Sequence, residues 1–289
     1  MITIQNEHLK VNINEHGGSM TSIQKDGIEY QWQGDKDSWL GQDVVIFPFV
    51  ARLKDQIYTI DGVTYSMKNH GLCRYSTLSV EAKKEDMVIL SLTWSESTLL
   101  QYPYKFKFFV TYELIDNELK VSYKVVNVDE KPIYFGIGGH PALKLPLKRE
   151  EGEDNIDGNS IEFEYEIEPN NYSLNKDGCF ITGKEKFGKI KKIDLSKNLF
   201  RKYKTLLLTD AYMNNLTLHR CDGVDIKMKV NNPKVLAIWS NENYGAYVCI
   251  EPWHGIPDLE ERNLELKDKE LINKLDKNME FDMSYSIII

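Results

Sequence analysis

Three histidines occur in short stretches rich in glycine and proline, at points where apolar segments end. The stretches are Asn69-His70-Gly71, Gly138-Gly139-His140-Pro141 and Trp253-His254-Gly255. An imidazole gains or loses a proton near neutral pH, so it suits general acid–base catalysis. Two glycines before His140 would let the backbone pass close to a ligand. His70 and His140 are therefore candidate site residues, although an ordinary hydrogen-bonded histidine is the alternative interpretation for each.

One glutamate stands at the end of an apolar segment. Glu251 follows residues 247–250 and runs directly into Pro252 and Trp253. A carboxylate on a buried strand is unfavourable unless it is paired or used in chemistry. Glu251 is thus a candidate general base, and an ion pair with a nearby Arg or Lys is the structural alternative.

Two further charged residues follow apolar segments. Arg52 comes after residues 47–51, and Asp210 comes shortly after residues 206–208. A guanidinium can bridge two hydroxyl oxygens or a carboxylate, which suits Arg52 to ligand binding. The alternatives are a salt bridge at a strand end for Arg52 and the start of a turn for Asp210.

The sequence predicts no metal site and no cofactor. His70 and Cys73 have a plausible spacing for two ligands, but no second pair follows at a zinc-like interval. The four cysteines are spread singly, so we expect reduced thiols. Neither glycine-rich phosphate-binding motif is present.

The charge balance excludes some partners. The chain has 289 residues, with 44 acidic and 36 basic side chains and a formal net charge of −8. An acidic surface argues against nucleic acid and anionic membranes, which require basic surfaces. No apolar run approaches the roughly 20 residues of a membrane helix, and the first residues lack a secretory pattern, so we expect a cytoplasmic protein.

The dominant periodicity is that of β-strands. Apolar side chains alternate with other residues in 9–13, 161–167, 224–230 and 279–289, and the last of these predicts a terminal strand that closes a sheet. Asp-Gly occurs five times, and this dipeptide favours tight hairpin turns. We therefore expect antiparallel hairpins that pair 19–24 with 28–32, 56–60 with 63–65, and 216–221 with 224–230.

Helical signals are weak and short. Ser95 could cap a single turn ahead of Pro103, and residues 263–275 could form a turn or two. Because no helices alternate regularly with the strands, Rossmann and TIM-barrel architectures are excluded. The sequence predicts an all-β protein with one domain over residues 1–289.

Taken together, these stretches resemble the aldose 1-epimerase (mutarotase) family, closest to its shorter bacterial members. The blocks are Phe47-Pro48 with Arg52, Asn69-His70-Gly71, Gly138-Gly139-His140-Pro141, Asp210-Ala211, Ile238-Trp239-Ser240 and Cys249-Ile250-Glu251-Pro252-Trp253. The resemblance implies a single-domain, antiparallel β-supersandwich of the galactose mutarotase type with a sugar cleft. It also implies that His140 is the general acid and Glu251 the general base, while His70, Arg52 and Asp210 bind the substrate.

The implied reaction interconverts the α and β anomers of a hexose by opening and closing its ring. The expected partner is a small-molecule aldose, and the expected assembly is a monomer or a homodimer. We expect the carboxylate of Glu251 to favour the protonated form of His140. Trp253 could form an aromatic wall or belong to the core, and His254 could lie at the rim. Two alternatives stay open: a hexose-6-phosphate 1-epimerase with a basic rim from Arg74 and Lys54, and a non-catalytic carbohydrate-binding protein.

Overall fold

The computed structural model describes residues 1–146, 156–241, 246–261 and 263–289. The named strands in these residues pair in an antiparallel manner, in five sheets. The prediction of an all-β fold is therefore confirmed. No helix of the described part of the chain is long and apolar enough to cross a bilayer.

A nine-stranded sheet forms one layer of the molecule. Its strands, in order across the sheet, are β18 (Ile190–Asp194), β15 (Ser160–Ile167), β20 (Asn215–His219), β21 (Asp225–Lys229), β25 (Glu280–Ile288), β11 (Glu118–Asn127), β10 (Phe106–Ile115), β9 (Met87–Thr93) and β8 (Ser79–Lys83). The terminal strand β25 pairs with β11 on one side and with β21 on the other. It thus lies inside the sheet and joins its two halves, where the sequence predicted a strand that closes a sheet.

An eight-stranded sheet carries the residues of interest. Its main order is β17 (Ile181–Lys186), β16 (Asn170–Leu174), β19 (Thr205–Thr209), β22 (Val235–Trp239), β23 (Tyr247–His254), β13 (Ile137–Gly139) and β5 (Val45–Ile46), and β14 (Ala142–Lys144) also pairs with β23. In β23 every residue from Tyr247 to Trp253 is buried. Such burial on both faces accounts for the continuous apolar run before Glu251.

The remaining elements are smaller. A four-stranded sheet contains β1 (Ile2–Gln5), β2 (Lys10–Ile13), β3 (Met20–Lys25) and β4 (Ile28–Glu29), and two-stranded sheets pair β6 (Ile57–Ile60) with β7 (Val63–Ser66) and β12 (Ile133–Phe135) with β24 (Asn273–Leu275). The α-helices are α1 (Glu96–Leu99) and α2 (Lys197–Tyr203), and 3-10 turns span Lys54–Gln56, Cys73–Tyr75 and Leu266–Asp268. A Ser95 capping box starts α1, as its sequence predicted. Helix α2 was not predicted.

The three predicted hairpins are confirmed. They are β3–β4, β6–β7 and β20–β21. Asp26 and Asp61 have φ values of 51° and 49°, and the glycines after them have 76° and 80°, the left-handed conformations that a tight hairpin turn needs. The alternation of 161–167 holds only in part: a shift in the β15–β18 register leaves Tyr165 64% exposed.

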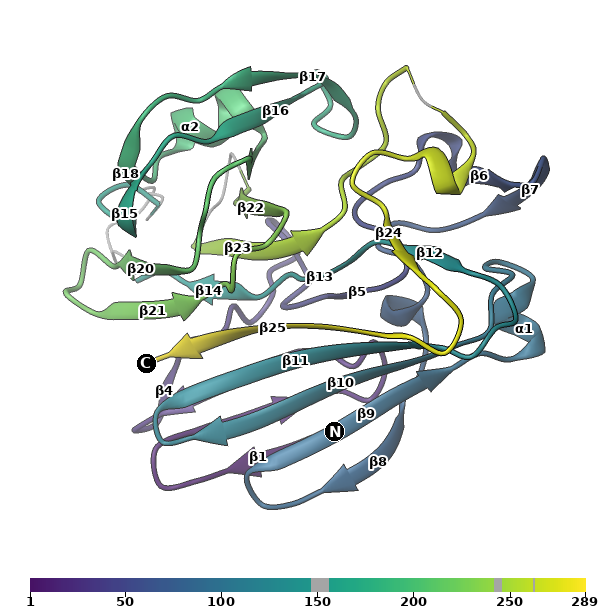
Figure 1. The fold of residues 1–289 in the computed structure, drawn as a ribbon. Helices are drawn as coiled ribbons and strands as arrows, with labels where there is room; N and C mark the ends of the chain where they lie inside the picture. The colour runs from purple at the N-terminus through teal and green to yellow at the C-terminus, as the bar shows by residue number, and fades with distance from the viewer. Residues whose placement is uncertain (147–155, 242–245, 262) are drawn as a thin grey trace.

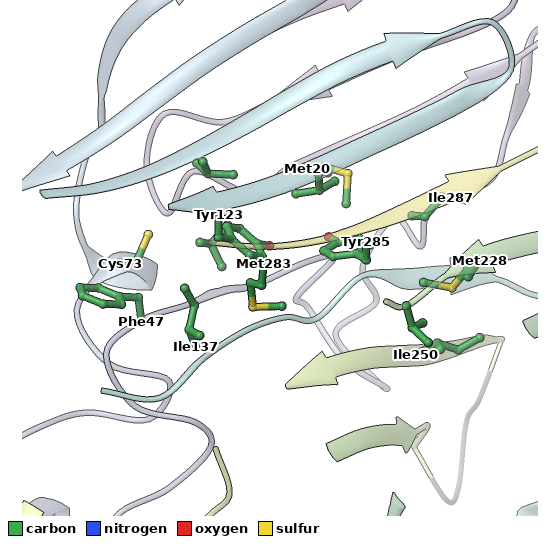
Figure 2. Close-up of a cluster of buried hydrophobic side chains, with 14 of the residues drawn as sticks. Met20, Phe47, Cys73, Tyr123, Ile137, Met228, Ile250, Met283, Tyr285 and Ile287 are labelled. Carbon is green, nitrogen blue, oxygen red and sulfur yellow. The ribbon is translucent and has the colours of Figure 1, made fainter. Parts of the chain in front are cut away.

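The largest core cluster contains apolar side chains of both large sheets and of the four-stranded sheet. In Figure 1, β25, β11, β10 and β9 run below β13 and β23. Figure 2 shows Tyr123 and Tyr285 from the nine-stranded sheet near Ile137 and Ile250 from the eight-stranded sheet. The apolar faces of both sheets are buried against each other, which fixes the position of β13 and β23 relative to the rest of the fold.

Candidate functional site

The register of β23 brings His140 opposite Glu251. Strand β13 pairs with β23 through Gly138 and Trp253, and β14 pairs with β23 through Ala142 and Cys249. His140 lies in the short break between β13 and β14, level with Glu251. The distance from Nε2 of His140 to Oε2 of Glu251 is 3.2 Å.

The two glycines before His140 serve packing. A Cβ atom on Gly138 would overlap Trp253, and one on Gly139 would overlap the ring of Tyr285. The sequence suggested that these glycines let the backbone approach a ligand. The structure shows instead that they let β13 lie close to β23 and to β25. This close packing fixes the position of His140, which follows β13.

Burial dominates the electrostatics of this pair. The His140 side chain is 9% exposed and that of Glu251 is 1% exposed. Burial, together with a smaller effect of the nearby Arg74 charge, lowers the pKa of His140 to about 3. Burial raises the pKa of Glu251 well above its usual value, and the charge of Asp43 adds to the rise. The expectation that the carboxylate would favour a protonated His140 is thus wrong, because loss of water favours the neutral form of both groups.

Both groups line a cavity of about 430 Å³. His70 and Arg52 line it too, and tryptophan rings surround the imidazole. The Trp39 ring stacks on His140 with centroids 5.2 Å apart and an interplanar angle of 25°. The Trp239 ring lies edge-on to His140 at 5.9 Å. The cavity therefore combines hydrogen-bonding groups with flat apolar faces, as pockets for small polar molecules do.

His70 is held tightly at the edge of His140. The two rings lie edge to face with centroids 5.4 Å apart. Ala51 and His70 exchange two hydrogen bonds: the His70 amide donates to the Ala51 carbonyl at 2.9 Å, and Nδ1 of His70 accepts from the Ala51 amide at 3.3 Å. Since Nδ1 is an acceptor, the ring proton is on Nε2. Burial lowers the pKa of His70 well below its usual value.

Basic side chains gather beside the cavity. Arg52 and Arg74 line it, and a neighbouring hollow of about 390 Å³ shares Arg52 and Asn69 and is lined also by Lys68. Lys68 and Arg74 lie over the Tyr75 ring at 5.1 and 5.6 Å. Lys54, which the sequence suggested as part of a basic rim, instead donates to the Glu260 carbonyl at 2.9 Å.

Asp210 does not join the other predicted residues. It follows β19, whose Thr205 and Leu207 line the cavity. A strand advances about 3.3 Å per residue, so Asp210 lies well beyond the cavity. There its carboxylate accepts from Asn170 at 2.8 Å and pairs with Lys184 at 3.3 Å. Asp177, from the turn between β16 and β17, is the aspartate in the lining.

Sequence reasoning missed several lining residues. Trp39 and Asp177 gave no catalytic signal, and Asn69 appeared only as a member of the Asn69-His70-Gly71 stretch. Trp253 is 4% exposed and also lines the cavity, so it belongs to both core and wall. His254 lies outside the lining, and its ring packs edge-on against Phe281 at 5.5 Å.

We assign no metal site to this cluster. Among the described residues, His140, Cys249 and Glu251 each offer a donor atom within 4.8 Å of the others. Burial raises the pKa of the Cys249 thiol well above its usual value, which disfavours the thiolate that a metal would need. Cys73, the other suggested ligand, is buried, and its Sγ donates to the Gly17 carbonyl at 3.7 Å.

Comparison with known proteins identifies the family of this chain. The profile of the aldose 1-epimerase family matches residues 1–263. The LacX protein of Lactococcus lactis is 31% identical over an alignment of 293 positions, which covers 95% of this chain and 94% of that protein. A galactose mutarotase related enzyme from Lactobacillus acidophilus has 29% identity and a TM-score of 0.90, covering 99% of this chain and 96% of that one.

A galactose mutarotase-like protein from Lactobacillus casei has 26% identity and a TM-score of 0.91, covering 100% of this chain and 99% of that one. The family resemblance and the galactose mutarotase-type fold expected from the sequence are thus both confirmed. The chain belongs to the aldose 1-epimerase family.

Proposed function

We propose that this protein is a cofactor-independent aldose 1-epimerase in which His140 and Glu251 move the protons. The observation that carries the proposal is the buried contact of 3.2 Å between Nε2 of His140 and Oε2 of Glu251 at a cavity of about 430 Å³. A non-catalytic sugar-binding protein has no need for such a pair, because burying both groups is unfavourable.

The reaction needs two proton transfers. On ring opening, Glu251 as base accepts the proton of the anomeric hydroxyl, and His140 as acid donates a proton to the ring oxygen. The bond from C1 to the ring oxygen breaks and an aldehyde forms at C1. Rotation of the aldehyde and the reverse transfers then close the ring on the other face. Each positioned transfer contributes about 10²–10⁴ in rate.

Because the two side chains are in contact, His140 can become protonated and Glu251 ionised without exchanging a proton with solvent. Burial favours a neutral imidazole beside a protonated carboxyl group. Transfer of that proton across the contact gives an imidazolium and a carboxylate, with the same total number of protons. Sugar hydroxyls at the pair stabilise the charged arrangement, so substrate binding itself favours the reactive form.

The other lining residues suit substrate binding. His70 offers its Nε2 proton and Arg52 its guanidinium to sugar hydroxyls. The tryptophan rings at His140 offer apolar faces to a pyranose and exclude water from the pair. Asp210 is not among the proposed substrate-binding residues, because its carboxylate is bound to Asn170 and Lys184.

Polarimetry on freshly dissolved α-glucose and α-galactose tests the proposal. We expect anomer exchange to reach equilibrium faster in proportion to enzyme concentration. If a range of aldoses raises the melting temperature while exchange stays at the spontaneous rate, the protein is a sugar-binding protein and the proposal is wrong.

A specific observation favours a second candidate, the 1-epimerisation of a phosphorylated hexose. Arg52, Lys68 and Arg74 lie at the cavity and its neighbouring hollow, and none forms an ion pair with an acidic group of the described residues. The guanidinium groups of Arg52 and Arg74 suit a phosphate monoester. Comparing kcat/KM for glucose and glucose 6-phosphate separates the candidates: a preference for the phosphate that is lost in Arg74→Gln supports the second one, and equal rates oppose it.

A further inference from the structure

A third buried carboxylate lies on the segment that pairs with the chain on either side of His140. Among the described residues, the buried acidic side chains are Asp43, Glu251 and Asp258. Asp258 forms an ion pair with Lys269. Asp43 is 6% exposed and has no basic partner in the described part of the chain; its Oδ2 accepts from the Met20 amide at 2.9 Å. A buried carboxylate held only by neutral groups is costly to keep.

The segment around Asp43 borders the strand that leads into His140. Val45 of β5 pairs with Gly139, and the Gln42 carbonyl accepts from the Ala142 amide at 3.2 Å. Trp39, on the same segment, stacks on the His140 ring. Gln42 and Val45 thus contact Ala142 and Gly139, which lie on either side of His140 in the sequence. Asp43 lies between Gln42 and Val45.

The groups that face Asp43 are mostly neutral. Its charge acts on Glu251, on Cys73 and Cys249, and on Tyr112, Tyr123 and Tyr285. The thiols and phenols carry no charge near neutral pH, so Glu251 is the member of this set that responds to Asp43. Burial raises the pKa of Asp43 itself to about 6, against the effect of the backbone amides of Met20, Val44 and His140.

We propose that Asp43 is a positioning residue whose negative charge, fixed at the Met20 amide, holds the shared proton on the His140–Glu251 pair. Two carboxylates close together in a buried site resist double ionisation. The charge on Asp43 therefore keeps Glu251 from losing its proton to solvent as the pH rises. This role rests on the proposed function of the pair.

The pH profile of kcat/KM in Asp43→Asn tests this role. Without the charge, ionisation of Glu251 becomes easier, so its pKa falls and the pair loses its proton at lower pH. We expect the alkaline limb of the profile to move down by about one pH unit, a shift typical of a nearby like charge. Asp43→Glu, which restores the charge, should return the limb towards the wild-type position. A folded Asp43→Asn protein with an unmoved limb overturns the proposal.

Infrared spectroscopy of the wild-type protein gives a readout that needs neither activity nor an Asp43 variant. The carbonyl band of a protonated carboxyl group that is missing in Glu251→Gln belongs to Glu251. The band that is still present in this variant, and that is lost when the pH rises through about 6, belongs to Asp43. We expect the Glu251 band to change frequency in the pH step in which Asp43 ionises. A Glu251 band that is constant through that step overturns the role of Asp43. A wild-type protein that shows the coupled bands without anomer exchange instead contradicts the proposed function.

Discussion

Among the described residues, two histidines, His140 and His219, contact carboxylates, and they do so in opposite settings. In the cavity, Nε2 of His140 lies 3.2 Å from Glu251, with side chains 9% and 1% exposed. On the β20–β21 hairpin, Nδ1 of His219 lies 2.8 Å from Asp225, with side chains 37% and 52% exposed. The chemical groups are the same and the surface contact is shorter, so distance alone does not distinguish a reactive pair from a structural one.

Exposure to water separates the two pairs. At the hairpin, both side chains are open to solvent, and Nε2 of His219 also contacts Glu162 at 3.4 Å, so the contact with Asp225 is one of several ways to satisfy these polar groups. Surface pairs of this kind contribute about 0–1 kcal/mol. In the cavity, burial moves both pKa values towards the neutral forms. A buried pair can therefore hold a mobile proton, which a surface pair shares with solvent.

The rate of anomer exchange should respond most strongly to changes in the buried pair. Glu251→Gln removes the proposed base while keeping the shape of the side chain, and we expect kcat to fall by about 10²–10⁴, the contribution of a positioned proton transfer. Stopped-flow polarimetry on the preferred aldose measures this change. Activity within threefold of wild type in a folded Glu251→Gln protein would remove Glu251 from the mechanism.

Asp225→Asn is the matched control in the surface pair. It makes the same kind of change, a carboxylate to an amide beside a histidine, far from the lining of the cavity. We expect unchanged anomer exchange. A comparable loss in both variants would show that the measurement reports folding rather than chemistry.

The second expected effect is on how stability depends on pH. His140 has a folded pKa of about 3 against an ordinary 6.5, so below pH 6.5 its unfolded form binds the additional proton and stability is lost as the pH falls. Glu251 has a folded pKa above its ordinary 4.5, so above pH 4.5 its folded form binds the additional proton and stability is lost as the pH rises.

In the pH range where both groups titrate, they change the free energy of unfolding in opposite directions. The pair should therefore contribute a flat maximum in the free energy of unfolding between about pH 4.5 and 6.5, falling on either side by up to about 1.4 kcal/mol per pH unit. Urea unfolding across pH, with the His140→Asn, Glu251→Gln double variant as reference, measures this contribution. A difference between the two proteins that does not vary with pH would contradict the assigned directions of the pKa shifts.

Local sequence patterns were sufficient for the all-β class and the hairpins, but not for the order of the strands. The alternation in 224–230 predicted strand β21. The Asp-Gly turns at Asp26 and Asp61 predicted where strands β4 and β7 begin. The position of β25 inside the nine-stranded sheet could not be predicted, because strand order depends on pairing between distant segments. The short helix α2 was also missed, since its Ser196 cap precedes a lysine-containing segment that resembles a loop.

The candidate site was predictable to the extent that its residues carry a local signal. Glu251 ends an apolar run and His140 follows two glycines, and pairing of β13 and β14 with β23 brought them together. Asp210 had the same kind of signal but lies past the end of β19, away from the cavity. Trp39 and Asp43 were not predicted, because their proximity to His140 arises only from the β5–β13 pairing.

The weakest perturbation is expected in the surface pair. His219 and Asp225 face each other across the β20–β21 hairpin, and both are substantially exposed. We expect a double-mutant cycle with His219→Asn and Asp225→Asn to give a coupling free energy below about 1 kcal/mol, falling further in 1 M salt because exposed charges are screened. Urea unfolding at pH 6 measures it. A coupling of several kcal/mol would mean that exposure is not what separates the two pairs, and the contrast with His140 and Glu251 would then need another cause.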